Sequence, residues 1–428
     1  MPRQLSRSPP LPHATPTLVL LAILLAAQPA LAEAPVSLAA PGATLEDVLA
    51  IARRLSPELA ARALDTEAAQ ARVTIAGSLA DPTLRITSDE IDRTRGPRQN
   101  KMLFTVEQEF PLWGKLDLRR DQANADVARS HADARATEAE LIEKVKVAFA
   151  QYYQADQAIR TTEDLHRVVH DMARVARDRY AQGRGSQQEV YKAEVEITRL
   201  STEIVRLETR RRSAAARLNA LLARPIDAPL ARPVKLRSLP SDPALAPEAL
   251  MQRAQVANPA LAGRDAQITA AAAGKQLADK SWYPDVMLKA GAIDRTGNGP
   301  NGYLAEIGLR VPLQWGLHDA QQREAAAQVG AAQARRQALE LQIQSELGEF
   351  LADLAGSRKT GDLIRTQLLP QSQALLRSGV AGYGLGRAEL VDVLSEHDLA
   401  NLRIVLLSAE FDQQRQLAAI ERLIGGDL

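Results

Sequence analysis

The feature that most constrains this 428-residue chain is a repeat with a very long period. A set of landmark residues recurs in the same order about 202 residues later: Pro57, Pro82, Trp113 and the pair Tyr180 and Gly183, then Pro259, Pro284, Trp315 and the pair Tyr383 and Gly386. Solenoid repeats have periods of about 20–50 residues, so this is not a solenoid. The spacing instead predicts a duplicated half-protein with an internal two-fold repeat.

The landmarks divide the chain into a leader, two repeats and a linker. Residues 1–32 are predicted to be a signal peptide, because Arg3 and Arg7 precede a short apolar stretch and Ala30-Leu31-Ala32 forms a small-residue cleavage site. The expected order is then a first repeat at 33–224 (a helix, a β-hairpin at 83–110 and a long helical hairpin at 115–224), a linker at 225–243, and a second repeat at 244–428 (a helix, a β-hairpin at 285–311 and a long helical hairpin at 316–425).

Composition excludes several classes of protein. The chain has no cysteine, which rules out disulfides and thiolate metal sites. Its 53 basic and 52 acidic residues nearly balance, which argues against a nucleic-acid partner. After the leader, no apolar run reaches the roughly 18 residues that a membrane-spanning helix needs.

Each predicted hairpin contains a segment in which apolar and polar residues alternate. In 101–110 the residues on one face are Met102, Phe104, Val106 and Phe110, opposite Glu107 and Glu109. In 303–311 they are Tyr303, Ala305, Ile307, Leu309 and Val311, opposite Glu306 and Arg310. Alternation over about ten residues is typical of a transmembrane β-strand. An amphipathic hairpin on a soluble core has the same pattern, so both interpretations stay open here.

The helical segments are unusually long. Residues from Lys115 to Arg179 contain neither proline nor glycine. At about 65 residues this helix would span roughly 95 Å. A helix from Pro57 (about 24 residues) and the helix returning after Gly183 (about 37 residues) would match its length when stacked end to end. This arithmetic indicates a two-layered wall of helices.

The strand count bears on assembly. Four strands cannot close a barrel, and open sheet edges are not tolerated in lipid. A membrane location therefore requires several copies of the chain, and a trimer would supply twelve strands.

At this point the sequence resembles the TolC family of outer-membrane efflux ducts over essentially the whole mature chain. The resemblance rests on the doubled order of proline, two strands, Pro-Leu and long helix, and on the motif from Tyr383 to Leu394, with its Val391-Asp392-Val393-Leu394. The segment from Phe110 to Lys115 looks closest to members that serve heavy-metal efflux systems of the resistance–nodulation–division type.

The resemblance implies an architecture and a set of partners. It implies a homotrimer with a twelve-stranded β-barrel in the outer membrane, continuing into a helical barrel that crosses the periplasm. The partners would be outer-membrane lipid, a periplasmic adaptor (membrane fusion) protein and an inner-membrane pump. The implied function is passive conduction of metal cations or small toxic compounds, without a cofactor, a bound metal or an enzymatic activity.

Acidic residues near the two helical turns are the candidate gate. Glu189 and Asp392 each follow the turn glycine by six positions, and three copies of Asp392 around a pore would form a cation-selective ring. By resemblance, Asp392 matches a constriction aspartate, whereas the second such aspartate is Ser395 here, with Glu396 a possible substitute. The alternative is that Glu189 and Asp392 only favour a helix N-terminus.

Other residues at the turns would latch the gate or dock a partner. Tyr383 and Arg387 match or nearly match residues that hold the closed state in the family, and we expect Arg387 to contact Glu189. The turns with Gly183, Arg184 and Gly386 would dock the adaptor. Pro370 lies within the second long helix and predicts a bend that the first repeat lacks.

No catalytic constellation stands out, and the paired histidines are weak metal candidates. His166 and His170 share a helix face but lack the glutamate of hydrolytic zinc motifs. Two further functions stay open: a periplasmic or secreted coiled-coil scaffold, and a duct for type I protein secretion.

Overall fold

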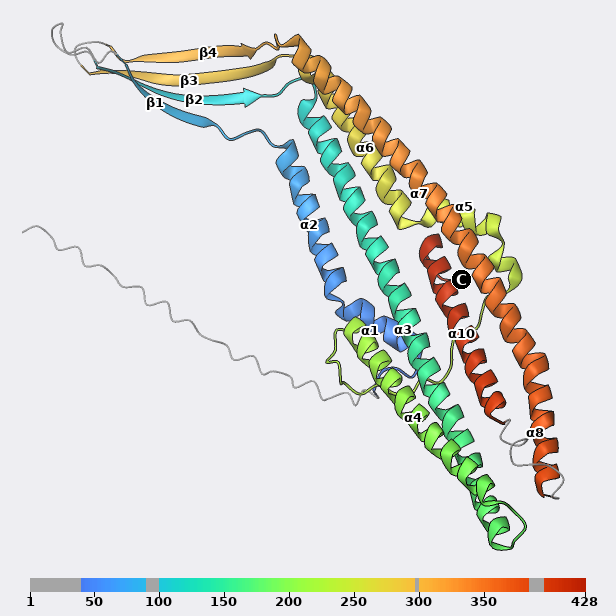
Figure 1. The fold of residues 1–428 in the computed structure, drawn as a ribbon. Coiled ribbons are helices and arrows are strands. Elements are labelled where there is room, and N and C mark those ends of the chain that lie inside the picture. The colour runs from blue at the N-terminus through green and yellow to red at the C-terminus, as the bar shows by residue number, and fades with distance from the viewer. Residues whose placement is uncertain (1–39, 90–99, 297–299, 385–395) are drawn as a thin grey trace, which may run out of the picture. The chain divides into compact units, whose positions relative to one another are not determined.

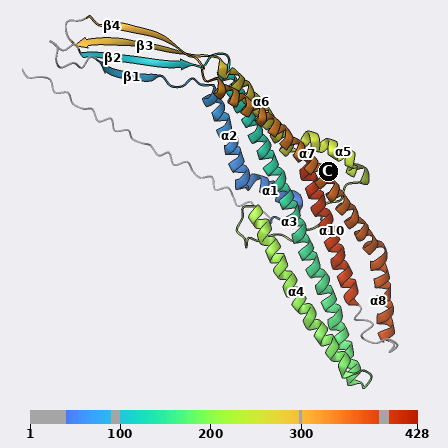
Figure 2. The same ribbon diagram turned by 45° about the horizontal axis from the view of Figure 1, so that its top comes forward.

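The computed structural model describes residues 40–89, 100–296, 300–384 and 396–428 (Figures 1 and 2). The predicted signal peptide and four predicted site residues (Gly386, Arg387, Asp392 and Ser395) lie outside these ranges.

One order of elements occurs twice along the chain. The first series is α1 (Leu45–Leu55), α2 (Pro57–Gly77), β1 (Thr83–Asp89), β2 (Asn100–Phe110), α3 (Lys115–Ala181) and α4 (Gln187–Leu221). The second is α5 (Pro247–Ala257), α6 (Pro259–Asp279), β3 (Asp285–Thr296), β4 (Gly302–Arg310), α7 (Trp315–Leu363), α8 (Leu369–Gly384) and α10 (Glu396–Ile424). Short 3₁₀ helices lie at Asp242–Leu245 and Lys280–Trp282, and a π-helix lies at Ile364–Leu368.

The predicted helix starts are confirmed in atomic detail. The Ser56 hydroxyl accepts a hydrogen bond from the Leu59 N–H at 3.4 Å, and Pro57 is the first residue of α2. The Asn258 side chain accepts from the N–H groups of Ala260 and Leu261, and Pro259 opens α6. In both cases the cap satisfies donors that the first turn leaves free, and proline occupies a position where its missing N–H does not matter.

The four strands form one antiparallel sheet in the order β1-β2-β3-β4. The central pair joins the two series, with Asn100 opposite Thr296 and Phe110 opposite Val286. In the described part of the chain, β1 pairs only with β2 and β4 only with β3. Both outer edges therefore present free backbone hydrogen-bonding groups.

The 67-residue helix α3 organises the helical region. It packs against α2 and α4, which follow its length as predicted, and against α6 and α10 (Figure 1). Alanine recurs among its buried residues, including Ala132, Ala148 and Ala173, and small side chains let neighbouring axes approach closely. Larger side chains such as Phe149 and Leu218 fill a core with α1 and α4, each contributing roughly 1.5–3 kcal/mol on burial.

The long helix of the second series is interrupted where Pro370 predicts a bend. Ile364–Leu368 forms a π-helix, in which the Leu369 N–H donates to the Ile364 carbonyl, five residues back. Pro370 has no N–H to give to the carbonyl of Thr366, so the regular α-helical pattern cannot continue through this turn. The first series has no such interruption, since α3 is continuous.

None of the helices in the described ranges is both long enough and apolar enough to cross a membrane.

Candidate functional site

The sheet has one apolar face and one charged face. Residues directly opposite each other in the ladders share a face, so the pairings sort the side chains. The apolar face carries Leu84, Ile86, Met102, Phe104, Val106, Phe110, Val286, Leu288, Ala290, Tyr303, Ile307 and Leu309. The opposite face carries Arg85, Lys101, Glu107, Glu109, Lys289, Arg295, Glu306 and Arg310. The predicted alternation is therefore confirmed in β2 and β4, whereas β3 follows it less strictly, with Asp294 on the apolar face and Met287 and Ile293 on the charged face.

Ion pairs connect strands across the charged face, both between neighbouring strands and across an intervening one. Lys289 pairs with Glu306 at 3.3 Å, and Arg310 reaches from β4 to Glu109 on β2 at 2.6 Å. Exposed pairs of this kind each contribute about 0–1 kcal/mol. These pairs therefore add little stability, but they make this face of the sheet polar. A face lined with charges is suited to contact with water, whereas the apolar opposite face is suited to contact with lipid.

Within the chain, a group of polar contacts joins the segment after β2 to the start of β3. The Lys115 ammonium donates to Asp285 Oδ1 at 2.8 Å and to the Tyr283 carbonyl at 2.9 Å. The Trp113 indole N–H donates to the Pro284 carbonyl at 2.8 Å, and its ring lies 5.2 Å from the Tyr283 ring. Trp113 holds a left-handed backbone with φ 64°, which is unfavourable for a bulky residue and needs contacts of this kind to persist.

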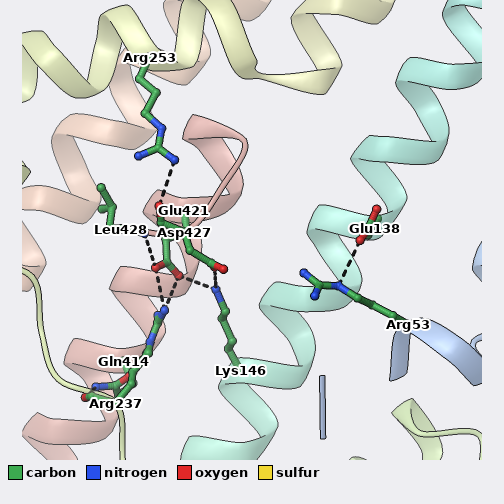
Figure 3. Close-up of polar contacts among 9 residues, drawn as sticks. All are labelled: Arg53, Glu138, Lys146, Arg237, Arg253, Gln414, Glu421, Asp427 and Leu428. Atoms are coloured by element: carbon green, nitrogen blue, oxygen red, sulfur yellow. Dashed lines mark hydrogen bonds and ion pairs between the residues drawn. The ribbon is translucent and has the colours of Figure 1, made fainter. Parts of the chain in front are cut away.

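A second ion cluster joins α3 to α10 (Figure 3). The Lys146 side chain is 4% exposed and donates to Glu421 Oε2 at 2.8 Å, while Arg237 of the linker donates to both Glu421 oxygens at 2.7 Å. Lys146 also donates to Asp427. Two cations thus surround one buried carboxylate, which connects both series and the segment between them.

The linker has a second charged anchor at Asp156. This carboxylate is buried in α3 and lies near three guanidinium groups, those of Arg160 (3.0 Å), Arg211 (3.3 Å) and Arg232 (3.8 Å). Burial first, and then the charge of Asp156, raise the pKa of the neighbouring Tyr152 phenol. Because Arg232 and Arg237 both belong to residues 225–243, two buried carboxylates hold the linker against the helices.

The cluster predicts a pH dependence of stability. The hydrogen bond from Lys146 lowers the pKa of the Asp427 carboxyl below its usual range. A carboxyl with a lowered folded-state pKa stabilises the fold above its unfolded pKa, near 4, and that contribution is lost as pH falls through the folded value. We expect the unfolding free energy of wild type to exceed that of Asp427→Asn at pH 7, with the difference shrinking below about pH 4. Denaturant unfolding of both proteins from pH 7 to below pH 4 measures the difference in unfolding free energy. A difference that does not change with pH contradicts the lowered pKa of Asp427.

Two of the predicted site residues lie in the turn between α3 and α4, and a third lies at the start of α4. Gly183 has φ +70°, a conformation that favours glycine, and Arg184 follows it in the turn. Ser186 caps α4, and its hydroxyl accepts from the Glu189 N–H at 3.2 Å. Glu189 therefore sits in the first helical turn, and its Oε2 is buried without a hydrogen-bond partner among the described residues. Its predicted partner Arg387 lies outside the description, and Tyr383 belongs to α8, so the gate and latch remain predictions.

In the described part of the chain, no group of three or more potential metal ligands occurs. His166 Nε2 lies 3.2 Å from Ser201 Oγ, and His170 is exposed on α3. His318, which appears isolated in sequence, lies 3.0 Å from Ser281 Oγ through Nδ1.

Two charged pairs at the contacts between the series were missed from sequence alone. Lys115 and Asp285 are 170 positions apart, and Lys146 and Glu421 are 275 apart. For the first pair, comparing the two repeats does reveal the charges. Lys115 corresponds to Leu317 and Asp285 corresponds to Thr83, so each charged residue has an uncharged counterpart in the other repeat.

Comparisons with known proteins agree on one fold. Residues 48–224 match the family described as outer membrane efflux protein. The outer membrane protein VceC from Vibrio cholerae is 19% identical with a TM-score of 0.76, over 90% of this chain and 96% of that chain. The outer membrane channel MtrE of Neisseria gonorrhoeae, in its open state, is 18% identical with a TM-score of 0.75, over 90% and 89%. CusC is 17% identical with a TM-score of 0.74, over 89% and 92%. Among curated protein sequences, none matches.

The fold, with its two-faced sheet, is the fold of VceC, MtrE and CusC. Residues 48–224 carry the sequence features of the outer membrane efflux protein family. Channels of this family are efflux ducts and not enzymes, as the sequence resemblance implied.

Proposed function

We propose that this chain forms the exit duct of a tripartite efflux system, as a homotrimer in the outer membrane. The observation that carries the proposal is the sheet, which is apolar on one face, charged on the other and open at both edges. An amphipathic sheet with free edges is stable in lipid only when the edges are paired. Three copies would pair them all and close a twelve-stranded barrel, with the charged face lining the lumen.

The helical region would continue the duct into the periplasm. At 67 residues, α3 is roughly 100 Å long. Twelve such helical columns would form a barrel whose turns meet a periplasmic adaptor at Gly183, Arg184 and Gly386. The adaptor and an inner-membrane pump would supply the energy, and the duct would conduct metal cations or small toxic compounds passively.

Cell fractionation and electrophoresis test the duct. We expect the protein in the outer-membrane fraction as a trimer that dissociates only on heating, and we expect the purified trimer to conduct ions across planar bilayers. A soluble periplasmic monomer would instead identify a coiled-coil scaffold. Loss of protein export in a deletion strain, with tolerance of metals and drugs unchanged, would identify a secretion duct.

The gate is proposed to lie at the periplasmic turns. Rings of Asp392 and Glu189 would narrow the pore, Ser395 would take the place of a second acidic ring, and Tyr383 and Arg387 would hold the closed state. The support for this arrangement is that Glu189 Oε2 is buried and has no hydrogen-bond partner among the described residues. This oxygen could therefore accept a hydrogen bond from Arg387.

Removing the latch should open the channel. We expect Arg387→Ala to raise single-channel conductance in planar bilayers, because it removes the cation that would hold Glu189. Arg174→Ala is the matched control, since this exposed arginine on α3 pairs with Asp171 in its own helix. Equal conductance of wild type and Arg387→Ala refutes the latch.

A further inference from the structure

The carboxylates on the charged face of the sheet are paired with cations of the same chain. Each carboxylate whose side chain the structure describes on this face lies near a basic group: Glu107 near Arg85 (3.9 Å), Glu109 near Arg310 (2.6 Å), Glu306 near Lys289 (3.3 Å) and Asp285 near Lys115 (2.8 Å). The negative charge of this face is therefore largely neutralised within the chain.

Two cations at one end of the same face are not neutralised in this way. Lys101, near the start of β2, is directly opposite Arg295, near the end of β3, and like charges in such positions repel. Among the side chains that the structure describes, neither cation forms an ion pair with a carboxylate. Lys101 is also opposite Asp89 in the ladder with β1, so this row of the sheet carries two cations and one carboxylate. Its net charge is positive.

The next row of the same face is apolar. Leu103 is opposite Ile293, and each lies two residues along its strand from one of the two cations. Leu304 of β4 is opposite Gly291 and therefore diagonal to Ile293. Gly302 is directly opposite Ile293, and among the described atoms only Ile293 Cδ1 would lie within 4 Å of a Cβ built there, at 3.9 Å. The space beside the Ile293 side chain is therefore open.

We propose that these two rows bind amphiphilic organic anions. The carboxylate or sulfonate group would lie between Lys101 and Arg295, and the apolar body would contact Leu103, Ile293 and Leu304. We call these five residues the anion site. The proposal rests on the duct proposed above, in which the charged face lines the lumen, and it specifies which class of compound the duct conducts.

Each part of an amphiphilic anion matches a part of the anion site. An anionic group between Lys101 and Arg295 removes their mutual repulsion and accepts charge-assisted hydrogen bonds from both. Apolar surface that is removed from water at Leu103 and Ile293 adds affinity in proportion to its area. One such site in each copy around a lumen would bind compounds in transit, and conduction requires that this binding be weak enough for the compounds to leave.

A metal cation finds no comparable site on this face. Hard divalent cations take carboxylate oxygens as ligands. The four described carboxylates already lie 2.6–3.9 Å from basic groups, and the charges without such a partner are those of Lys101 and Arg295. Of the two substrate classes proposed above, the sheet therefore favours small organic compounds over metal cations.

Equilibrium dialysis with trimers in lipid nanodiscs tests the ligand class, with empty nanodiscs as the blank. We expect 2-naphthalenesulfonate to bind saturably, with one molecule per chain. Methanesulfonate should bind at least about tenfold more weakly, because it has the anionic group without the apolar body. 2-Naphthylmethylammonium should also bind at least about tenfold more weakly, because it has the same ring with the opposite charge. Equal binding of the sulfonate and the ammonium compound, or of the two sulfonates, overturns the proposal.

Substitution of the cation pair tests where the sulfonate binds. Lys101→Gln/Arg295→Gln should weaken binding of 2-naphthalenesulfonate at least about tenfold. Lys289→Gln/Arg310→Gln is the matched control, because it removes two cations from the same face at positions roughly 20 Å or more along the strands. That distance exceeds the Debye length of about 10 Å at 0.1 M salt, so the affinity should stay within about twofold of wild type.

Conductance without added ligand separates the anion site from the duct. Trimers that conduct ions across planar bilayers, but in which Lys101→Gln/Arg295→Gln binds the sulfonate as tightly as wild type, refute the anion site and leave the duct standing. If this variant does not assemble, the wild-type comparison of the sulfonate with the ammonium compound decides the proposal. A wild-type protein that forms no conducting trimer refutes the duct itself.

Discussion

Glu421→Leu should lower the free energy of unfolding by about 3–5 kcal/mol, because it removes one partner of a buried ion cluster. Glu421 is 3% exposed and receives hydrogen bonds from both Lys146 and Arg237. Without it, the Lys146 ammonium stays buried with only the exposed Asp427 carboxylate as a counter-charge. Denaturant unfolding of the purified protein in detergent, followed by circular dichroism, measures the change.

Glu138→Ala is the matched control for the buried cluster. Glu138 pairs with Arg53 at 3.2 Å, in the neighbourhood shown in Figure 3, but both side chains are about half exposed. Breaking such a pair should cost about 0–1 kcal/mol. If the two variants lose the same stability, burial does not set the strength of the Lys146 cluster.

Ile307→Arg should prevent assembly in the outer membrane. Ile307 lies on the apolar face of β4 and is 76% exposed in the single chain. An arginine facing lipid near the bilayer midplane costs about 2–4 kcal/mol in each chain, and a trimer would bear this three times. The amount of heat-modifiable trimer in outer-membrane fractions measures the effect.

Leu304→Arg separates the faces of the same strand. Leu304 is opposite Gly291, on the face that carries Glu306 and Arg310, so an arginine there would enter the aqueous lumen. We expect trimer levels near those of wild type, with altered ion selectivity in planar bilayers. Equal loss from both substitutions contradicts the assigned sidedness of the sheet and, with it, the barrel.

Local signals were enough to predict much of the fold. The pairs Ser56-Pro57 and Asn258-Pro259 predict helix starts because a cap and a first-turn proline act within one turn of the chain. The absence of proline and glycine between Lys115 and Arg179 predicts the length of α3, and alternation in 101–110 predicts β2. Each of these features is decided by residues close in sequence.

Contacts between distant residues could not be predicted in this way. Nothing near Lys146 indicates that Glu421 will meet it, since a charged residue in a long helix is usually solvated. The Lys115–Asp285 pair was detectable only by asking where the two repeats differ in charge. The π-helix could not be predicted from neighbouring residues either. Pro370 predicts that the helix is disturbed, but it does not predict that the turn before it contains an extra residue. The proposed gate at Asp392 and Arg387 stays a prediction.

The π-helix at Ile364–Leu368 also changes the angular phase of the second hairpin. One extra residue in a turn rotates every later side chain by about 100° around the helix axis. A heptad register counted along α7 therefore does not carry over into α8, whereas α3 keeps a single register from Lys115 to Ala181. The described side chains of α8 before residue 380 thus lie on a different face from the one that the α7 pattern alone would indicate, and this rotation needs no displacement of the helices.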